Sequence, residues 1–211
     1  MGLVSKKCVD FVKGFEGYEP IVKNDMVGVP TLGYGMTGQE IKGLRYVTEG
    51  QASKMLEELL NSKYALPIKN SLVAKGVMLN QNQFDAITSM AYNIGVGGLL
   101  GSKLYKNICS GSRDRNLLTS NFRSWDMAGG KHTEGLLRRR TEEAQMFFNT
   151  NSMGANYVMA KDNKILLLQK VCNRVGIRGA NGKVLVEDGL GGANTTAAKA
   201  KLKVYIANVT K

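Results

Sequence analysis

Apolar residues recur every three or four positions in several stretches of the chain, and each such stretch predicts an amphipathic helix. The first stripe consists of Val4, Cys8, Phe11, Val12 and Phe15, and it ends at Glu16. Glu16 is therefore expected at the end of a helix, half buried. Residues 18 to 37 follow with glycines, two prolines and alternating apolar positions, which predict a small hairpin sheet. We expect no strand after this sheet.

Helical patterns dominate the rest of the first 150 residues. A capping box marks one helix start, with Thr48 as N-cap and Gln51 three positions later. A long core helix is predicted at residues 83 to 94, because Phe84, Ile87 and Ala91 share one face. Further helices are expected at residues 103 to 110, 114 to 124 and 135 to 149. A small sheet followed by helices is the α+β pattern, here mostly helical.

The chain changes character near residue 150. Residues 149 to 156 are small and polar and show no periodicity, so they are predicted to be a linker. We therefore expect two domains, residues 1–150 and 155–211. In the second, one helical face is predicted over residues 165 to 175, a break at residues 179 to 182, and another helix over residues 195 to 209.

The composition and the net charge limit the classes of function that the protein can have. The 211 residues are 43% hydrophobic, which supports a real core, and the net charge of +12 predicts an anionic partner. Residues 155 to 211 hold 10 Lys and Arg against 3 Asp and Glu, whereas residues 1 to 154 hold 19 against 14. Nucleic acid is weakly supported, because the tail has only Tyr157 and Tyr205 for base stacking. Bacterial cell walls are polyanions and fit the charge pattern better.

Cysteine and histidine usage gives no sign of a metal site. Cys8, Cys109 and Cys172 are odd in number, far apart and in no CxxC pattern, so reduced thiols are expected. His132 is the single histidine, which excludes a His-cluster metal site, and its polar surroundings predict a loop or cap position. The longest apolar run, residues 165 to 168, is far too short to span a bilayer. The first residues also lack the apolar region of a secretory signal.

Glu16, Asp25 and Thr31 together suggest the chemistry of a glycan-cutting site. Breaking an acetal requires one carboxyl group that gives a proton to the leaving oxygen and a second that is ionised. Burial of a carboxyl disfavours its charge, which suits Glu16, whereas Asp25 lies in a polar turn and should stay solvated. Each residue alone also has an ordinary interpretation, as a solvated helix end, a turn aspartate and a strand threonine.

The spacing resolves this ambiguity, because Glu16-x8-Asp25-x5-Thr31 followed by Gly-Tyr-Gly resembles the phage-type lysozymes of glycoside hydrolase family 24. Residues 83 to 97 resemble a second block of that family, and the set Trp125, Gly129-Gly130 and 135–143 resembles a third. Together the blocks span roughly residues 5 to 148. One departure is Met36, where family members commonly have His.

The resemblance implies a lysozyme-like domain with a small β-hairpin sheet that hydrolyses the β-1,4 bond between N-acetylmuramic acid and N-acetylglucosamine. It implies Glu16 as general acid, Asp25 to orient or activate water, and Thr31 to hydrogen-bond that water or the Asp. Residues expected to line the glycan cleft are Gly33, Tyr34, Gly35, Tyr92 and Asn93. One arginine of Arg138, Arg139 and Arg140 could pair with Glu16. No metal or organic cofactor is expected.

A second resemblance concerns the tail. Residues 188 to 198 are similar to the DGxxGxxTxxA block of the small three-helix peptidoglycan-binding domain, preceded by its Leu-Gln pair at Leu168-Gln169. That domain's later Phe-Gln is Leu202-Lys203 here. A generic helical cap is the alternative.

The two resemblances imply an endolysin that acts on peptidoglycan as a monomer and recognises no specific nucleic acid. It would be made in the host bacterial cytoplasm without a signal peptide and would act at the cell wall. Two alternatives stay open: a non-catalytic wall-binding or virion structural protein of the same fold, and a nucleic-acid-binding protein supported by charge alone.

Overall fold

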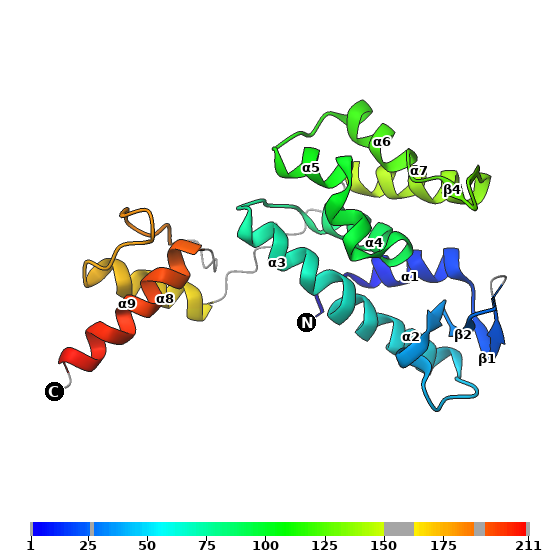
Figure 1. Ribbon diagram of the computed structural model, residues 1–211, viewed down its shortest axis with the longest axis horizontal. Helices are drawn as coiled ribbons and strands as arrows, with labels where there is room; N and C mark the ends of the chain where they lie inside the picture. Colours follow the sequence, from blue (N-terminus) through cyan, green and yellow to red (C-terminus); the bar gives the residue numbers. More distant parts are fainter. Residues whose placement is uncertain (1, 26–27, 150–162, 188–192, 210–211) are drawn as a thin grey trace. The chain divides into compact units, whose positions relative to one another are not determined.

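The structure is a computed structural model that describes residues 2–25, 28–149, 163–187 and 193–209 (Figure 1). Its contacts group the chain into two compact units, residues 1–68 with 81–153, and residues 69–80 with 154–211. The predicted linker lies outside the described residues except for Asn149, so the domain boundary near residue 150 stays a prediction.

Helix α1 (Lys6–Glu16) ends where the sequence predicts. Its N-cap is Ser5, whose side-chain oxygen accepts from the Cys8 backbone N–H, and its buried face includes Cys8 and Val12. The helix stops because Gly17 takes a positive φ of 71° while its N–H still bonds to the carbonyl of Lys13. Glu16 is consequently the last helical residue.

A three-stranded antiparallel sheet follows α1. Strands β1 (Glu19–Asn24), β2 (Pro30–Gly33) and β3 (Met36–Thr37) pair in that order. Lys23 faces Thr31 across the first pair, and the register shifts between Glu19 and Lys23. The predicted hairpin sheet is confirmed, with Asp25 in the β1–β2 connection and Thr31 on β2.

The predicted helices are also confirmed. After the short 3-10 helix η1 (Gly38–Ile41), α2 (Glu49–Leu59) begins with the expected capping box of Thr48 and Gln51. A π-helical segment, η2 (Leu60–Ala65), connects it to α3 (Leu66–Ala74). The remaining helices of this part are α4 (Gln81–Gly101), α5 (Lys103–Cys109), α6 (Arg115–Arg123) and α7 (Glu134–Phe148).

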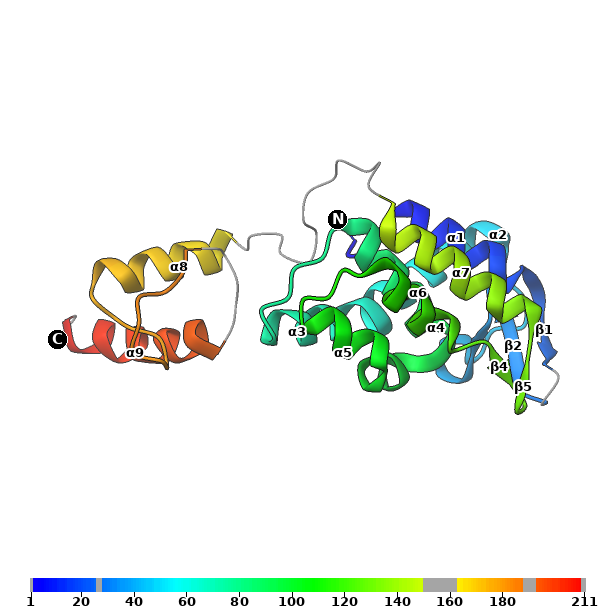
Figure 2. The same cartoon turned by 90° about the horizontal axis from the view of Figure 1, so that it is seen from above.

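Helix α4 forms the centre of the first unit, and α7 lies alongside it in both ribbon views (Figure 2). Phe84, Ile87 and Met90 of α4 are fully buried, and Phe122 of α6 packs edge-on against Phe147 of α7. The helical path of α4 breaks at Gly95, whose φ is 80° and ψ is 154°. The helix predicted to end at residue 94 is thus continued by a second helical segment.

The expectation that no strand follows residue 37 is wrong. Strands β4 (Met127–Ala128) and β5 (Lys131–His132) form a hairpin whose two turn residues, Gly129 and Gly130, have φ of 57° and 78°. Two adjacent positive-φ residues are what a tight hairpin needs. Two-residue strands leave no period-2 pattern, so the Gly-Gly pair was the available signal. His132 therefore lies on an exposed strand, with Nδ1 2.8 Å from Oδ1 of Asp126.

In the second unit, α8 (Asn163–Arg174) packs against α9 (Ala193–Val209). Their core contains Cys172, Leu185, Ala198 and Leu202, with Leu168, Val175 and Ile177 packed against it. Within the described part of residues 155–211 there are two helices, and the expected three-helix form stays a prediction.

The three cysteines are free thiols, as predicted, with Cys8 and Cys172 buried. Burial raises the pKa of the Cys8 thiol, with the charges of Asp85 and Glu143 acting in the same direction. Across the described ranges, no helix combines the length and apolar character needed to cross a bilayer.

Candidate active site

Glu16, Asp25 and Thr31 line one cleft of about 670 Å³. They reach it from three places: the C-terminal end of α1, the β1–β2 connection, and β2. Gly33 and Gly35 complete one side of the cleft. The structure therefore brings the three predicted catalytic residues together, although they come from separate elements.

Glu16 is shielded and held by an arginine. Its side chain is 19% exposed, and its Oε1 lies 2.5 Å from Nη1 of Arg139, which is itself 4% exposed. On the other side, a Cβ added at Gly35 would lie 3.0 Å from Glu16 Oε2. Among the three arginines that sequence analysis left open, Arg139 is the one that forms an ion pair with Glu16.

Arg139 belongs to a buried network that sequence analysis missed. Its Nε lies 3.3 Å from Glu143 Oε1, which also accepts from Ser89 Oγ at 2.8 Å and from Arg140 Nη2 at 2.9 Å. Arg140 Nε lies 2.9 Å from Glu143 Oε2, close enough for an ion pair but without hydrogen-bond alignment. Both side chains are fully buried. The available signal was the spacing of Arg139 and Glu143, four residues apart on one helix.

Desolvation dominates the titration of this network. Burial raises the pKa of Glu143, although the charges of Arg140 and Arg139 and the Ser89 hydroxyl act in the opposite direction. Burial also lowers the pKa of the Arg140 guanidinium, against the attraction of Glu143. Both pKa shifts indicate that burial disfavours the charged forms of Glu143 and Arg140. The pairing of these opposite charges offsets part of that cost.

Asp25 and Thr31 are tied to the same residue of the β1–β2 connection. Asp25 Oδ1 accepts from the Val29 N–H at 2.8 Å, and Thr31 Oγ1 donates to the Val29 carbonyl at 3.1 Å. Asp25 is exposed, as expected for a residue of a polar turn. Asp25 and Thr31 thus share an attachment to Val29, and the expectation that Thr31 bonds the water or Asp25 stays a prediction.

The residues expected to bind the glycan divide into two groups. Gly33 and Gly35 line the cleft, and both have positive φ. The Tyr34 side chain is instead buried, and its hydroxyl donates to Glu49 Oε1 at 2.9 Å. Tyr92 donates its hydroxyl to the Tyr34 carbonyl at 2.6 Å, and burial followed by the charge of Glu16 raises its pKa. Asn93 is exposed on α4. A role of these residues in substrate binding stays a prediction.

Met36 stands at the position where histidine is common in the resembled family. It is buried, and its Cε occupies the space that a side chain at Gly33 would need. Met36 is therefore a packing residue beneath the cleft. Tyr18, Glu19 and Lys23 also line the cleft and were not predicted. Glu19 and Lys23 lie on β1, and Tyr18 directly precedes it.

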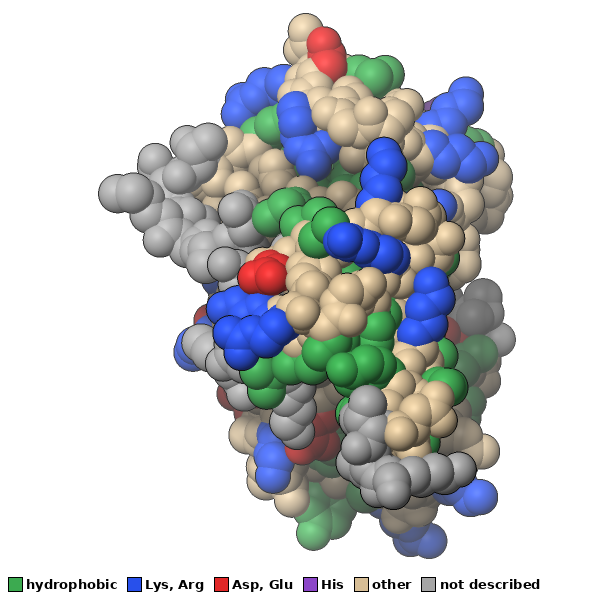
Figure 3. All heavy atoms as spheres, turned by 90° about the vertical axis from the view of Figure 1, so that its left-hand side faces the viewer, with side chains coloured by type: hydrophobic (Ala, Val, Ile, Leu, Met, Phe, Trp, Pro, Cys, Tyr) green, Lys and Arg blue, Asp and Glu red, His purple; other side chains and the backbone are tan. Residues whose placement is uncertain are grey.

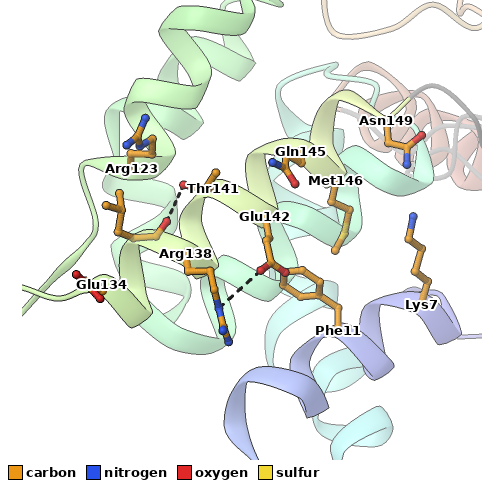
Figure 4. A pocket seen from close by; sticks show the side chains of 11 residues that line it. Lys7, Phe11, Arg123, Glu134, Arg138, Thr141, Glu142, Gln145, Met146 and Asn149 are labelled. Atoms are coloured by element: carbon orange, nitrogen blue, oxygen red, sulfur yellow. Dashed lines mark hydrogen bonds and ion pairs between the residues drawn. The ribbon is translucent and has the colours of Figure 1, made fainter.

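A larger groove of about 790 Å³ lies between α1 and α7 (Figure 4). It gathers none of the predicted site residues. Its two carboxylates are Glu134, which is exposed, and Glu142, which pairs with Arg138 at 3.7 Å in a solvent-exposed position. Because neither carboxyl is shielded from water, the smaller cleft with Glu16 is the better candidate for acid chemistry.

Comparison with known proteins shows the family. The profile of the phage lysozyme family matches residues 13–143. The endolysin of Bacillus phage PZA is 31% identical over 149 residues, which cover 68% of this chain and 54% of the phage protein. The endolysin of Salmonella phage P22 is 30% identical over 150 residues, covering 69% of this chain and 98% of that protein. The chain spans 54% and 59% of the length of the endolysins of Bacillus phages PZA and B103.

Solved structures show the same fold. A P22 lysozyme variant aligns with a TM-score of 0.58 and 29% identity, covering 71% of this chain and all of that one. The muramidase domain of SpmX from Asticaccaulis excentricus aligns with a TM-score of 0.57 and 28% identity, covering 69% and 97%. The predicted lysozyme-like α+β fold is confirmed. Because the family match covers more than half of the sequence and includes Glu16, Asp25, Thr31 and Arg139, the chain belongs to the phage lysozyme family.

Proposed function

We propose that this protein is an endolysin of glycoside hydrolase family 24 that hydrolyses the β-1,4 bond between N-acetylmuramic acid and N-acetylglucosamine in bacterial peptidoglycan. The observation that carries the proposal is the cleft that Glu16 shares with Asp25 and Thr31. One carboxyl group is shielded and fixed by Arg139, and the other lies in solvent. Acid-assisted cleavage of an acetal needs this difference between two carboxyl groups.

In the proposed reaction, Glu16 gives its proton to the glycosidic oxygen as the bond to the anomeric carbon breaks. Asp25 orients or activates the water that adds to that carbon, and it receives the proton that the water loses. Thr31 helps to hold this water. Because its hydroxyl proton is donated to the Val29 carbonyl, the Thr31 oxygen acts toward water as an acceptor.

Arg139 gives the acid a fixed position. Its Nη1 lies 2.5 Å from Glu16 Oε1, and its Nε lies 3.3 Å from Glu143 Oε1, so the guanidinium is held from two sides. Proton transfer requires such a fixed position of the donor.

We further propose that residues 155–211 hold the enzyme on the wall. The support is their charge, 10 Lys and Arg against 3 Asp and Glu, together with the resemblance at residues 188 to 198. Tethering raises the effective concentration of substrate at the catalytic domain to the order of mM for a short flexible linker. A chain shortened to residues 1–150 should therefore cut soluble fragments normally and intact walls slowly.

The decisive experiment follows the turbidity of purified, bare cell walls, with mass spectrometry of the soluble products. We expect clearing by the wild-type protein and new reducing ends on N-acetylmuramic acid. Folded protein that binds walls without clearing them would instead indicate a non-catalytic wall-binding or virion structural protein. DNA binding that persists near physiological salt would favour the nucleic-acid alternative, because nonspecific binding falls steeply with salt.

A further inference from the structure

Helix α8 has two different faces. Its inner face carries Leu168 and Cys172 into the core of the second unit, where Val175, just past the end of the helix, joins them. Its outer face carries Leu167, Lys170, Val171 and Arg174, which recur at the three- and four-residue spacing of one helical stripe. These four residues, together with Glu187, line a groove of about 460 Å³.

The second wall of this groove is fixed in place by Asn173. Its Nδ2 donates to the Leu185 carbonyl at 2.8 Å, and its Oδ1 accepts from the Leu185 N–H at 2.9 Å. The same Nδ2 lies 3.1 Å from Oε1 of Glu187 and so positions that carboxylate. Leu185 is buried, and its neighbours Val184 and Val186 are exposed. Asn173 therefore holds residues 185 to 187 against α8, where Glu187 lines the groove.

Two polar residues of the motif contact each other inside the unit. Gln169 Nε2 donates to Thr195 Oγ1 at 3.3 Å, and both side chains are buried. Gln169 and Thr195 thus join α8 to α9. The groove on the outer face of α8 supplies other groups for recognition, namely cations and an acid beside aliphatic side chains.

We infer that this groove binds the peptide stems of peptidoglycan, that is, short acidic peptides with aliphatic side chains. Lys170 and Arg174 would pair with peptide carboxylates, Glu187 with an amine, and Leu167 and Val171 would contact the side-chain methyl groups. The described lining contains no aromatic ring, and stacking on such rings is a common way to hold sugars. On the face of the molecule that Figure 3 shows, hydrophobic side chains lie among Lys and Arg, and acidic side chains are sparse.

This inference rests on the proposed wall binding, so its test measures binding separately from lysis. The full chain carrying Glu16→Gln is sedimented with sacculi from which other anionic wall polymers have been extracted by acid. The groove variant adds Lys170→Glu and Arg174→Glu. The matched control adds Lys199→Glu and Lys203→Glu, which make the same charge change at exposed positions of α9 outside the groove. A milder variant, Lys170→Gln with Arg174→Gln, serves if the first one unfolds.

The groove variant should bind sacculi at least about tenfold more weakly, the loss expected for charge-assisted contacts, and the control should stay within about threefold. Peptide stems released from sacculi by an amidase should compete, and stripped glycan strands should bind the parent chain as weakly as sacculi bind the groove variant. Equal losses in both variants, or equal binding of stripped glycan, would overturn the inference while leaving wall binding intact. If the parent chain binds no sacculi at any ionic strength, both the groove inference and the proposed wall binding are wrong. The turbidity result tests catalysis and is independent of this outcome.

Discussion

Glu16→Gln and Glu143→Gln make the same chemical change at two places in one network, and they should have opposite consequences. The amide at position 16 is nearly isosteric but carries no transferable proton, so loss of a general acid should lower the rate of wall lysis by about 10² to 10⁴. Stability should change by only about 1 kcal/mol, because Glu16 is partly exposed and Arg139 keeps Glu143 as its partner.

Loss of the Glu143 carboxylate should cost far more stability. It is the counter-charge of both arginines, and Arg140 is fully buried. Removing one partner of a buried ion pair costs about 3 to 5 kcal/mol. With a urea dependence of about 2 kcal/mol/M, the unfolding midpoint of Glu143→Gln should fall by roughly 1.5 to 2.5 M, against about 0.5 M for Glu16→Gln.

The two measurements are urea unfolding followed by circular dichroism and turbidity of purified walls well below the unfolding midpoint. Glu16→Gln should be folded and inactive, and Glu143→Gln should be destabilised but measurably active while folded. A folded Glu16→Gln protein with full activity would remove Glu16 from the mechanism. Similar unfolding midpoints for the two variants would refute the account of the buried network.

Other predictions test the remaining parts of the site. Asp25→Asn and Thr31→Ala should each lose activity because the attacking water is no longer oriented or activated. A substrate with an activated leaving group should therefore not rescue them but should partly rescue Glu16→Gln. The reverse pattern would exchange the assigned roles. Gly35→Ala should lower lysis at least tenfold, because φ is 80° and the new Cβ would lie 3.0 Å from Glu16 Oε2; wild-type rates would show that the carboxylate is free to move. Burial raises the pKa of Asp85 above its ordinary value of 3.8, so its stabilising contribution is complete below that value and is lost as pH rises through the folded-state pKa. Asp85→Asn should therefore flatten the unfolding midpoint measured against pH in this range, and an unchanged profile would contradict the assignment.

The sequence predicted the elements well because their signals are local. The stripe that ends at Glu16, the capping box at Thr48 and the helix before Gly95 each depend on neighbouring residues. The β4–β5 hairpin was missed because its strands are two residues long.

Local signals alone did not predict the candidate site, and the resemblance to a family was also needed. Spacing singled out Glu16, Asp25 and Thr31, but the partner of Glu16 lies 123 residues away in sequence. Three consecutive arginines present the same charge, and helix packing alone decides which of them reaches the acid. The burial of Tyr34 was likewise not visible in its motif, because alternation fails in a tight glycine turn.

The shared carboxylate of Glu143 also determines how α7 aligns with α4. Ser89 comes from α4, whereas Arg139, Arg140 and Glu143 come from α7, and all four meet at one point. Sliding α7 along α4 by one turn would keep the ion pairs within α7, but it would take Glu143 and Arg139 away from the hydroxyl and carbonyl of Ser89 and Arg139 away from Glu16. Each buried polar group that lost its partner in this way would cost about 1 to 3 kcal/mol. A purely apolar interface would tolerate such a slip far better. The network therefore favours one alignment of α7 along α4 during folding. That alignment is the one that places Arg139 next to Glu16.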